Sequence, residues 1–160
     1  MDIRPLTPQD LPVLLDLAID TFGPFYENSY RPLVGETVFR NRHGRWREDY
    51  RQHLAALDNR DEGRSAAVAE DSGTVVGFVG WIVQPGQAHG EIDIIAVAPS
   101  ARRRGVGRAL AEHAVAKLKD SGAHDISVGT GGDDFHAAAR ALYEALGFTP
   151  FSIVNYTKAV

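Results

Sequence analysis

The chain has 160 residues, of which 44% are hydrophobic and 24% charged; these fractions are typical of a globular protein, and we expect one domain over residues 1–160. Its formal net charge of −4 disfavours nucleic acid and anionic membranes as partners. The lack of cysteine excludes disulfides, thiolate metal ligands and a cysteinyl intermediate, and we expect no metal site. No apolar run is long enough to span a bilayer and the N-terminus lacks the pattern of a signal peptide, so we expect a cytoplasmic protein.

The first half of the chain predicts a strand, two helices and a hairpin. Thr7 and Pro8 have the residue types of a helix N-cap and a first helical position, and Gly23-Pro24 predicts the end of the helix that follows. The predicted elements are, in order, a strand at 3–6, a helix at 7–22, a helix at about 45–57, and a hairpin of strands 65–70 and 74–84.

The second half predicts two helices that each follow a strand. Gly122 and Gly147 mark the expected helix ends. The predicted elements are a turn at 85–87, a strand at about 90–98, a helix at 106–118, a strand at 126–129, a helix at about 135–146 and a last strand at 151–158. This alternation of strands and helices predicts an α/β fold with a mixed sheet.

The junction between the strand at 92–97 and the helix at 106–118 has the features of an anion site. It reads Arg102-Arg103-Arg104-Gly105-Val106-Gly107. The two glycines allow a bound group to approach the backbone N–H groups at the helix start, which have no intrahelical partners and carry partial positive charge. Three arginines add full positive charge, so the junction predicts a pyrophosphate site.

Two carboxylates, Glu91 and Asp93, stand in the strand that precedes this junction. Since side chains alternate across a strand, both are expected to share a face with Ile95 and Val97. They are candidates for accepting a proton beside the anion site. The alternative is that they lie near a strand end and are solvated, or pair with arginines.

Tyr143 lies on the last predicted helix, on one face with Ala139, Leu142 and Leu146. The spacing alone favours an ordinary core aromatic whose hydroxyl is satisfied.

Three motifs in order resemble the GNAT superfamily of acyl-CoA-dependent N-acetyltransferases. Residues 102–107 match its (Gln/Arg)-x-x-Gly-x-(Gly/Ala) signature, Ile95-Ala96-Val97-Ala98-Pro99 matches the end of its fourth strand, and residues 142–148 match its tyrosine-containing helix end. The resemblance covers about residues 92–148. It implies a mixed central β-sheet of six to seven strands flanked by about four helices, and acetyl-CoA as co-substrate.

The resemblance also implies roles for individual residues. The backbone of the strand end would bind the pantetheine arm, Tyr143 would sit beside the thioester sulfur, and Glu91 stands where some members carry a catalytic glutamate. His136 replaces a common asparagine and either contacts the cofactor or substrate or merely starts the helix. The implied cofactor-binding residues are Ile95, Ala96, Val97, Arg102, Arg103, Arg104, Gly105, Val106, Gly107, Arg108, His136 and Tyr143.

These roles predict direct transfer of an acetyl group to a primary amine of a small molecule or peptide. An alkyl ammonium, with a pKa of about 10, must lose a proton before it attacks, and Glu91 is the first candidate base and Asp93 the second. Tyr143 is the candidate acid for the departing thiolate.

The acceptor pocket is expected to use the aromatic and basic stretch over residues 22–50. Its composition fits a small aromatic or acidic amine, although core aromatics with solvated arginines are the alternative for most single residues. The candidate substrate-binding residues are Phe25, Tyr26, His43, Trp46 and Tyr50.

Other functions fit the sequence less well. A non-catalytic sensor of acyl-CoA would need neither Glu91 nor Tyr143. A nucleotide site of the P-loop type lacks its Gly-Lys-Ser/Thr, and a nucleic-acid patch conflicts with the acidic whole. A homodimer is possible, since dimers are common in the family the chain resembles.

Overall fold

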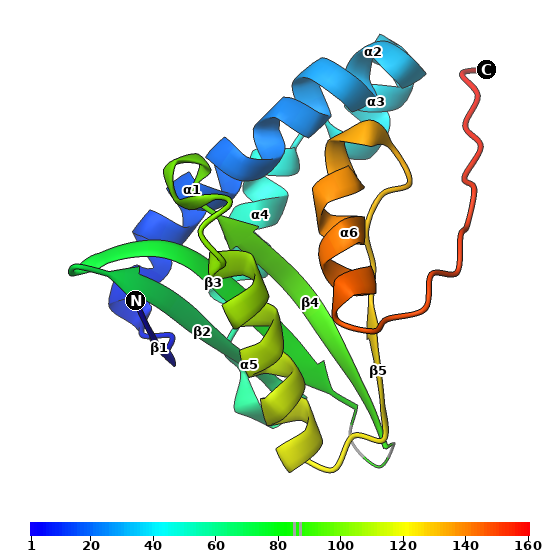
Figure 1. Ribbon diagram of the computed structural model, residues 1–160. Helices are drawn as coiled ribbons and strands as arrows, with labels where there is room; N and C mark the ends of the chain where they lie inside the picture. The colour runs from blue at the N-terminus through cyan, green and yellow to red at the C-terminus, as the bar shows by residue number, and fades with distance from the viewer. Residues whose placement is uncertain (85, 87) are drawn as a thin grey trace.

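The computed structural model describes residues 1–84, 86 and 88–160, so part of the predicted turn at 85–87 lies outside the described residues. Within them the chain forms a five-stranded sheet of order β1-β2-β3-β4-β5 with helices on both faces (Figure 1). The strands are β1 (Asp2–Pro5), β2 (Arg64–Asp71), β3 (Thr74–Val83), β4 (His89–Val97) and β5 (Asp125–Val128). The helices are α1 (Leu11–Pro24), α2 (Arg31–Val34), α3 (Glu36–His43), α4 (Trp46–Ala55), α5 (Val106–Asp120) and α6 (Ala137–Ala145), with a π-helical segment η2 (Phe25–Tyr30) between α1 and α2.

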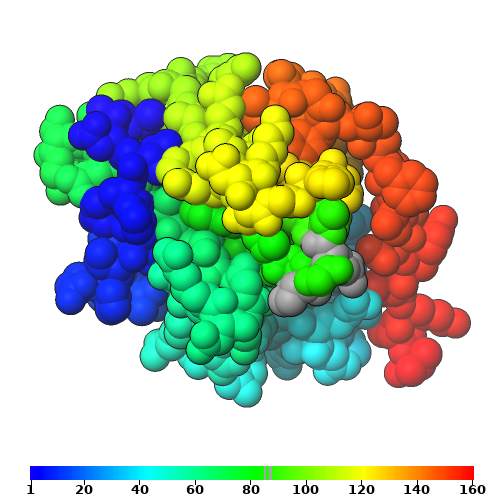
Figure 2. Space-filling view, turned by 90° about the horizontal axis from the view of Figure 1, so that it is seen from below, coloured from blue at the N-terminus to red at the C-terminus, as the bar shows by residue number. Residues whose placement is uncertain are grey.

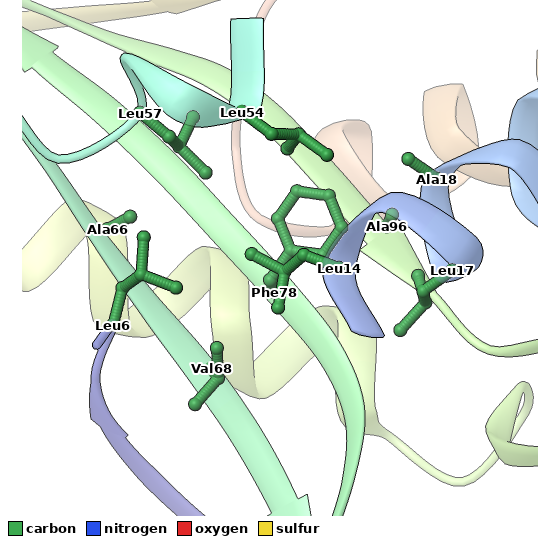
Figure 3. Packing of buried hydrophobic residues seen from close by; sticks show 10 residues of the cluster. All are labelled: Leu6, Leu14, Leu17, Ala18, Leu54, Leu57, Ala66, Val68, Phe78 and Ala96. Atoms are coloured by element: carbon green, nitrogen blue, oxygen red, sulfur yellow. The ribbon is translucent and has the colours of Figure 1, made fainter. Parts of the chain in front are cut away.

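One face of the sheet packs against α1 and α4. Phe78 of β3 is fully buried there, beside Leu14 of α1 and Leu54 of α4 (Figure 3). Burying a side chain of this kind contributes about 2 kcal/mol, so this cluster fixes both helices on the sheet. The α4 helix therefore presents a defined face to the end of β4.

The other face packs against α5. Val106, Leu110, Ala114 and Leu118 recur at intervals of four residues and are buried against β3 and β4. A Cβ on Gly90 would lie 2.6 Å from Leu118 Cδ2, so glycine at this position lets the helix approach the sheet closely. The helix expected at 106–118 is thus present and its start is held against the sheet.

A β-bulge in the β3–β4 pair changes which way the β4 side chains point. The register shifts between Gly80 and Trp81, so that Ile92 and Ile94 have partners in β3 and Asp93 does not. Ile92 packs in the α5 cluster and Ile94 in the α1–α4 cluster, although they are two residues apart. The expectation that Asp93 shares a face with Ile95 and Val97 is therefore wrong, because regular alternation breaks at the bulge.

The strands β4 and β5 diverge where the sheet ends. They pair in parallel from His89–Asp125 to Ile92–Val128, whereas β4 continues beside β3 as far as Val97. Beyond Ile92 the second edge of β4 thus has no strand next to it among the described residues. This divergence opens the sheet just before the start of α5.

The predicted end of the first helix is also wrong. Helix α1 runs through Gly23 and Pro24 and continues as the π-helical segment, so the proline changes the helix type and does not end the helix. Gly23 serves packing instead, since a Cβ there would lie 3.1 Å from Trp46 Cη2.

The last predicted strand, 151–158, does not form, and the described sheet has five strands rather than six to seven. The alternation of apolar residues in this segment is typical of a strand, but a strand also needs a neighbour to satisfy its backbone. In Figure 2 the segment lies at the rim of the molecule (red), beyond α6 (orange), and its residues are exposed.

Among the described residues, none of the helices combines the length and the apolar character that crossing a membrane requires.

Candidate active site

A cleft of about 380 Å³ opens where β4 and β5 diverge. Its walls come from α1 and α4 on one side, from β4 at the base, and from the segment after β5 and α6 on the other side. The lining residues are Phe22, Tyr26, Trp46, Asp49, Tyr50, His53, Ile92, Asp93, Ile94, Ile95, Val128, Gly129, Thr130, His136, Ala139 and Tyr143.

The end of β4, which is predicted to bind the pantetheine arm, lies at the base of this cleft, and one of its carbonyl groups already accepts hydrogen bonds. Ile95 lines the cleft, and Ala96 is buried against α1 and α4. The Val97 carbonyl accepts hydrogen bonds from Thr21 Oγ1 at 3.4 Å and from Arg102 Nε at 3.3 Å. Because β4 has no strand beside it here, the cleft leaves one edge of the strand open to an extended ligand.

The predicted anion site has the backbone of a phosphate cradle. Arg103 has a φ of 60° and Gly105 a φ of 81°, and α5 starts directly afterwards. A left-handed conformation is uncommon for a residue other than glycine, such as Arg103. Together the two positive φ angles curl the loop in front of the helix. The first bond inside the helix runs from the Ala109 N–H to the Gly105 carbonyl, which leaves the preceding N–H groups of Val106, Gly107 and Arg108 available to an anion.

The arginine side chains of this loop are exposed, and two of the basic residues form ion pairs in addition to the bond from Arg102 to the Val97 carbonyl. Arg104 Nη2 lies 2.8 Å from Asp71 Oδ2, and Arg108 Nε lies 2.8 Å from Glu112 Oε1. Exposed ion pairs of this kind contribute little to stability, so these arginines can reorient toward a ligand at small cost.

Tyr143 reaches the cleft from α6. Its side chain is 9% exposed and packs edge-on against Phe148, with ring centroids 6.0 Å apart. Burial raises the pKa of the Tyr143 phenol, so the hydroxyl holds its proton near neutral pH.

Of the two candidate carboxylates, the structure places Asp93 and not Glu91 among the described residues of the cleft wall. Asp93 Oδ2 lies 2.8 Å from Nε2 of His53 on α4 and 3.2 Å from Nη1 of Arg64 on β2. Glu91 stands in the part of β4 that pairs with Ser127 of β5, before the strands diverge. Their catalytic roles remain predictions.

Sequence reasoning missed His53. It lies three residues after Tyr50 and seven after Trp46 on α4, so these three residues share one helical face. This spacing was the signal that could have found it.

Three of the five predicted acceptor residues line the cleft. Tyr26 stacks on Trp46 with ring centroids 5.0 Å apart, and Tyr50 stacks on Phe22 at 5.1 Å. Burial raises the pKa of Tyr50, and Trp46 Nε1 is held by a 3.0 Å hydrogen bond to Glu27. The wall is therefore a rigid aromatic surface.

The other two lie outside the described lining and support it. The Phe25 ring is 4.7 Å from that of His136, and His43 packs against Tyr26 at 5.3 Å. His136 lines the cleft, and its Nδ1 lies within hydrogen-bonding distance of Asp133 Oδ1, so its orientation is fixed.

The charge of the cleft differs from what the composition of residues 22–50 suggests. Among the described residues that line it, the acidic ones are Asp49 and Asp93, and none is arginine or lysine. Arg31 and Arg47, for example, lie over the rings of Phe39 and Trp46. The described lining therefore carries acidic groups and no arginine or lysine, in contrast to the basic composition of the segment. The described residues contain no cluster of three or more potential metal ligands.

Comparison with known proteins identifies the family that combines this diverging sheet with this helix start. The family model described as Acetyltransferase (GNAT) family matches residues 25–148. The chain is 41% identical over 73 residues to the mycothiol acetyltransferase of Beutenbergia cavernae. These 73 residues make up 46% of this chain and 24% of that protein. The ribosomal-protein-alanine N-acetyltransferase of Brucella melitensis has a TM-score of 0.62 and 28% identity, covering 92% of this chain and 83% of that one. The PaiA N-acetyltransferase of Thermoplasma acidophilum, solved with coenzyme A, has a TM-score of 0.70 and 18% identity, covering 92% and 89%.

The chain belongs to the GNAT acetyltransferase family. This confirms the resemblance carried by residues 102–107, the mixed α/β fold and, at the level of the family, acetyl-CoA as co-substrate of an acetyltransferase. The chain spans about a quarter of the length of the Beutenbergia cavernae protein, with which it shares one segment.

Proposed function

We propose that this chain transfers an acetyl group from acetyl-CoA directly to a primary amine of a small molecule or peptide. The observation that supports this most strongly is that one cleft is bounded by an open strand edge, a buried tyrosine, a carboxylate and a histidine. A module that only senses acyl-CoA has no need of such paired groups around the point of transfer.

The backbone carries the thioester in this proposal. The N–H groups of Val106, Gly107 and Arg108 hold the pyrophosphate. The open edge of β4 aligns the pantetheine arm at Ile95, and at Val97 once the side chains of Thr21 and Arg102 leave its carbonyl. The thioester then lies near Tyr143, at the α6 side of the cleft.

The protein side chains supply the proton transfers. A thiolate with a pKa of roughly 8.5 needs one proton as it leaves, and Tyr143 donates it. The ammonium of the acceptor loses its proton on the opposite wall, where Asp93 and His53 stand. Each transfer contributes about 10²- to 10⁴-fold, and holding amine and thioester together contributes much of the rest.

The acceptor is proposed to be a cationic amine with a flat or apolar body. Tyr26, Trp46 and Tyr50 provide stacking surface, and Asp49 lies at the same wall. A cation beside aromatic rings and a carboxylate is favoured by 0.5–2 kcal/mol, roughly, from the aromatic contact alone.

Thiol release from acetyl-CoA tests this function. The assay uses the purified chain with a panel of arylalkyl amines, polyamines, amino sugars, acidic amines and peptide N-termini. Release that depends on a cationic amine supports the proposal. If acetyl-CoA raises the melting temperature while every amine fails to release thiol, the chain is a sensor and the proposal is refuted.

A homodimer is proposed to form through residues 151–160. Five large apolar side chains of this segment are exposed, among them Phe151 at 87% and Tyr156 at 91%. The segment has the alternation of a strand but no neighbouring strand, and β5 is an edge strand of the described sheet. In a dimer, the segment of one copy can therefore form backbone hydrogen bonds with the edge of the other copy. Light scattering should show a dimer that Tyr156→Asp dissociates and Leu33→Asp, an exposed position on α2, does not; a monomeric wild type refutes it.

A further inference from the structure

We propose that His53 accepts the proton of the acceptor ammonium, and that Asp93 is a positioning residue that holds the imidazole. This inference rests on the proposed function and decides between the two groups on that wall of the cleft. It places the proton acceptor on α4, whereas Glu91 and Asp93, the two carboxylates first considered, lie on β4.

The two nitrogen atoms of the His53 ring have different surroundings. Nε2 is shielded from solvent and lies 2.8 Å from Asp93 Oδ2, at an angle outside hydrogen-bond geometry. The side chain as a whole is 36% exposed and lines the cleft, and of its two ring nitrogens only Nε2 is buried without a partner, so Nδ1 is the nitrogen that a ligand can reach. Catalytic hydrogen bonds commonly align only when substrate binds, and a slight rotation of the ring would align this one.

Asp93 is poorly suited to take the proton itself. Its Oδ2 is shared between His53 and Arg64, and its side chain is 15% exposed. Protonating the carboxylate would remove the nearer and more buried of the two counter-charges of Arg64, since the other, Glu62, lies 3.7 Å away and is 63% exposed, and this loss is costly. A carboxylate that keeps its charge instead orients the ring by accepting from Nε2–H and stabilises the imidazolium that forms, as in other carboxylate–histidine pairs.

The surroundings of His53 contain charged groups of both signs. His53 lies in the last turn of the ten-residue helix α4, where the backbone carbonyl groups carry partial negative charge. The charged and titratable groups around it are Asp49 and Tyr50 on α4, Asp93 on β4, and Arg64 on β2 with its second partner Glu62, while His136 and Tyr143 lie across the cleft.

The step balances as follows. The ammonium gives one proton to Nδ1 of His53, and the neutral nitrogen attacks the thioester carbonyl carbon. The new C–N bond forms and the C–S bond breaks, with the sulfur taking the Tyr143 proton. The surplus proton on nitrogen restores the phenol, and the imidazolium releases its proton to solvent. The products are the N-acetyl amine, free thiol and one proton.

The test uses His53→Ala with exogenous imidazole and the amine that the wild type acetylates best. The variant should lose about 10²-fold or more in kcat with an unchanged KM for acetyl-CoA, and imidazole should restore activity in a saturable way. The matched control is His124→Ala, an exposed histidine before β5, which should keep wild-type activity and gain nothing from imidazole. His53→Gln serves as the second variant if the alanine variant is unfolded.

The pH profile tests the role of Asp93. Wild-type kcat/KM should fall on the acid side as the base becomes protonated, and this limb should be missing in His53→Gln. In Asp93→Asn the limb should move to lower pH, because the imidazolium has lost its counter-charge. Activity of His53→Ala within threefold of wild type, absence of imidazole rescue, or a limb unchanged in Asp93→Asn would each overturn the inference. A wild type that acetylates no amine refutes the proposed function instead.

Discussion

Replacing Gly105 with alanine should weaken acetyl-CoA binding and lower the stability of the fold, whereas the same substitution at Gly107 should do neither. A Cβ at this position would lie 3.6 Å from Val97 Cγ2 and 3.7 Å from Leu142 Cδ2, both ordinary contacts. Alanine is also a better helix former than glycine by up to about 1 kcal/mol, which corresponds to a gain of about 2–4 °C in Tm for a chain of this size. The protein itself therefore has no need of glycine here.

The phosphate-binding loop does need glycine at position 105. Gly105 has a φ of 81°, a left-handed conformation that costs alanine about 1–2 kcal/mol. Relaxing the loop out of this conformation would withdraw an N–H group from the anion. Losing one hydrogen bond to a charged group costs about 1.5–3 kcal/mol, so Kd for acetyl-CoA should rise roughly 10- to 150-fold in Gly105→Ala.

Calorimetric titration with acetyl-CoA, paired with thermal unfolding of the free protein, measures both quantities. Gly107→Ala is the matched control, because the signature that residues 102–107 match accepts alanine at this position. If Gly105→Ala binds acetyl-CoA within twofold of wild type, the ligand does not depend on the conformation of this loop. If Gly107→Ala unfolds at a lower temperature than wild type, the reasoning about the space at Gly107 is wrong.

Two further predictions concern Tyr143 and the salt bridge at the N-terminus. Tyr143→Phe should lower kcat by about 10²-fold or more with little change in the Kd of acetyl-CoA, and unchanged turnover in steady-state assays would remove its role as acid. Asp10 accepts two 2.8 Å hydrogen bonds from Arg4, which hold the pKa of that carboxyl well below its usual range. Because the pKa is lower in the folded state, the ionised carboxyl stabilises the fold at pH values above its unfolded pKa near 4, and this stabilisation is lost as pH falls further. Asp10→Asn should therefore lower the free energy of unfolding in urea by about 2 kcal/mol at pH 7 and by less at pH 3. An equal loss at both pH values would contradict the ion pair.

The parts of the site that depend on local sequence were predictable. The start of α5 is one, since two glycines and the following apolar repeat occur within a few residues and need no information from elsewhere in the chain. Tyr143 is another, because its place on α6 relative to Gly147 follows from the helix period. The resemblance to the family rested on these same local motifs.

The direction of Asp93 was not predictable in the same way. It depends on the register between β3 and β4, and the bulge between Gly80 and Trp81 has no clear signature in β4 itself. The prediction of a last strand at residues 151–158 was wrong for a related reason. Alternating apolar residues describe a segment that is able to pair, whereas the neighbouring strand is a property of the whole sheet.

The wall that we propose binds the acceptor depends on even longer-range packing. Pro24 in α1 leads into a π-helical turn, and that turn brings Tyr26 over Trp46 of α4, while Gly23 leaves space for the edge of the same indole. Residues that sequence reasoning assigned to a helix end thus shape the pocket. The same arrangement turns the face of α4 that carries His53 toward β4, so the bulge that redirects Asp93 and the helix that carries His53 meet at one point. The thioester side of the cleft therefore depends on one local backbone motif, and the acceptor side depends on packing between α1, α4 and β4. Substitutions at Gly23 or Pro24 should accordingly change the KM for the amine and leave the KM for acetyl-CoA unaffected.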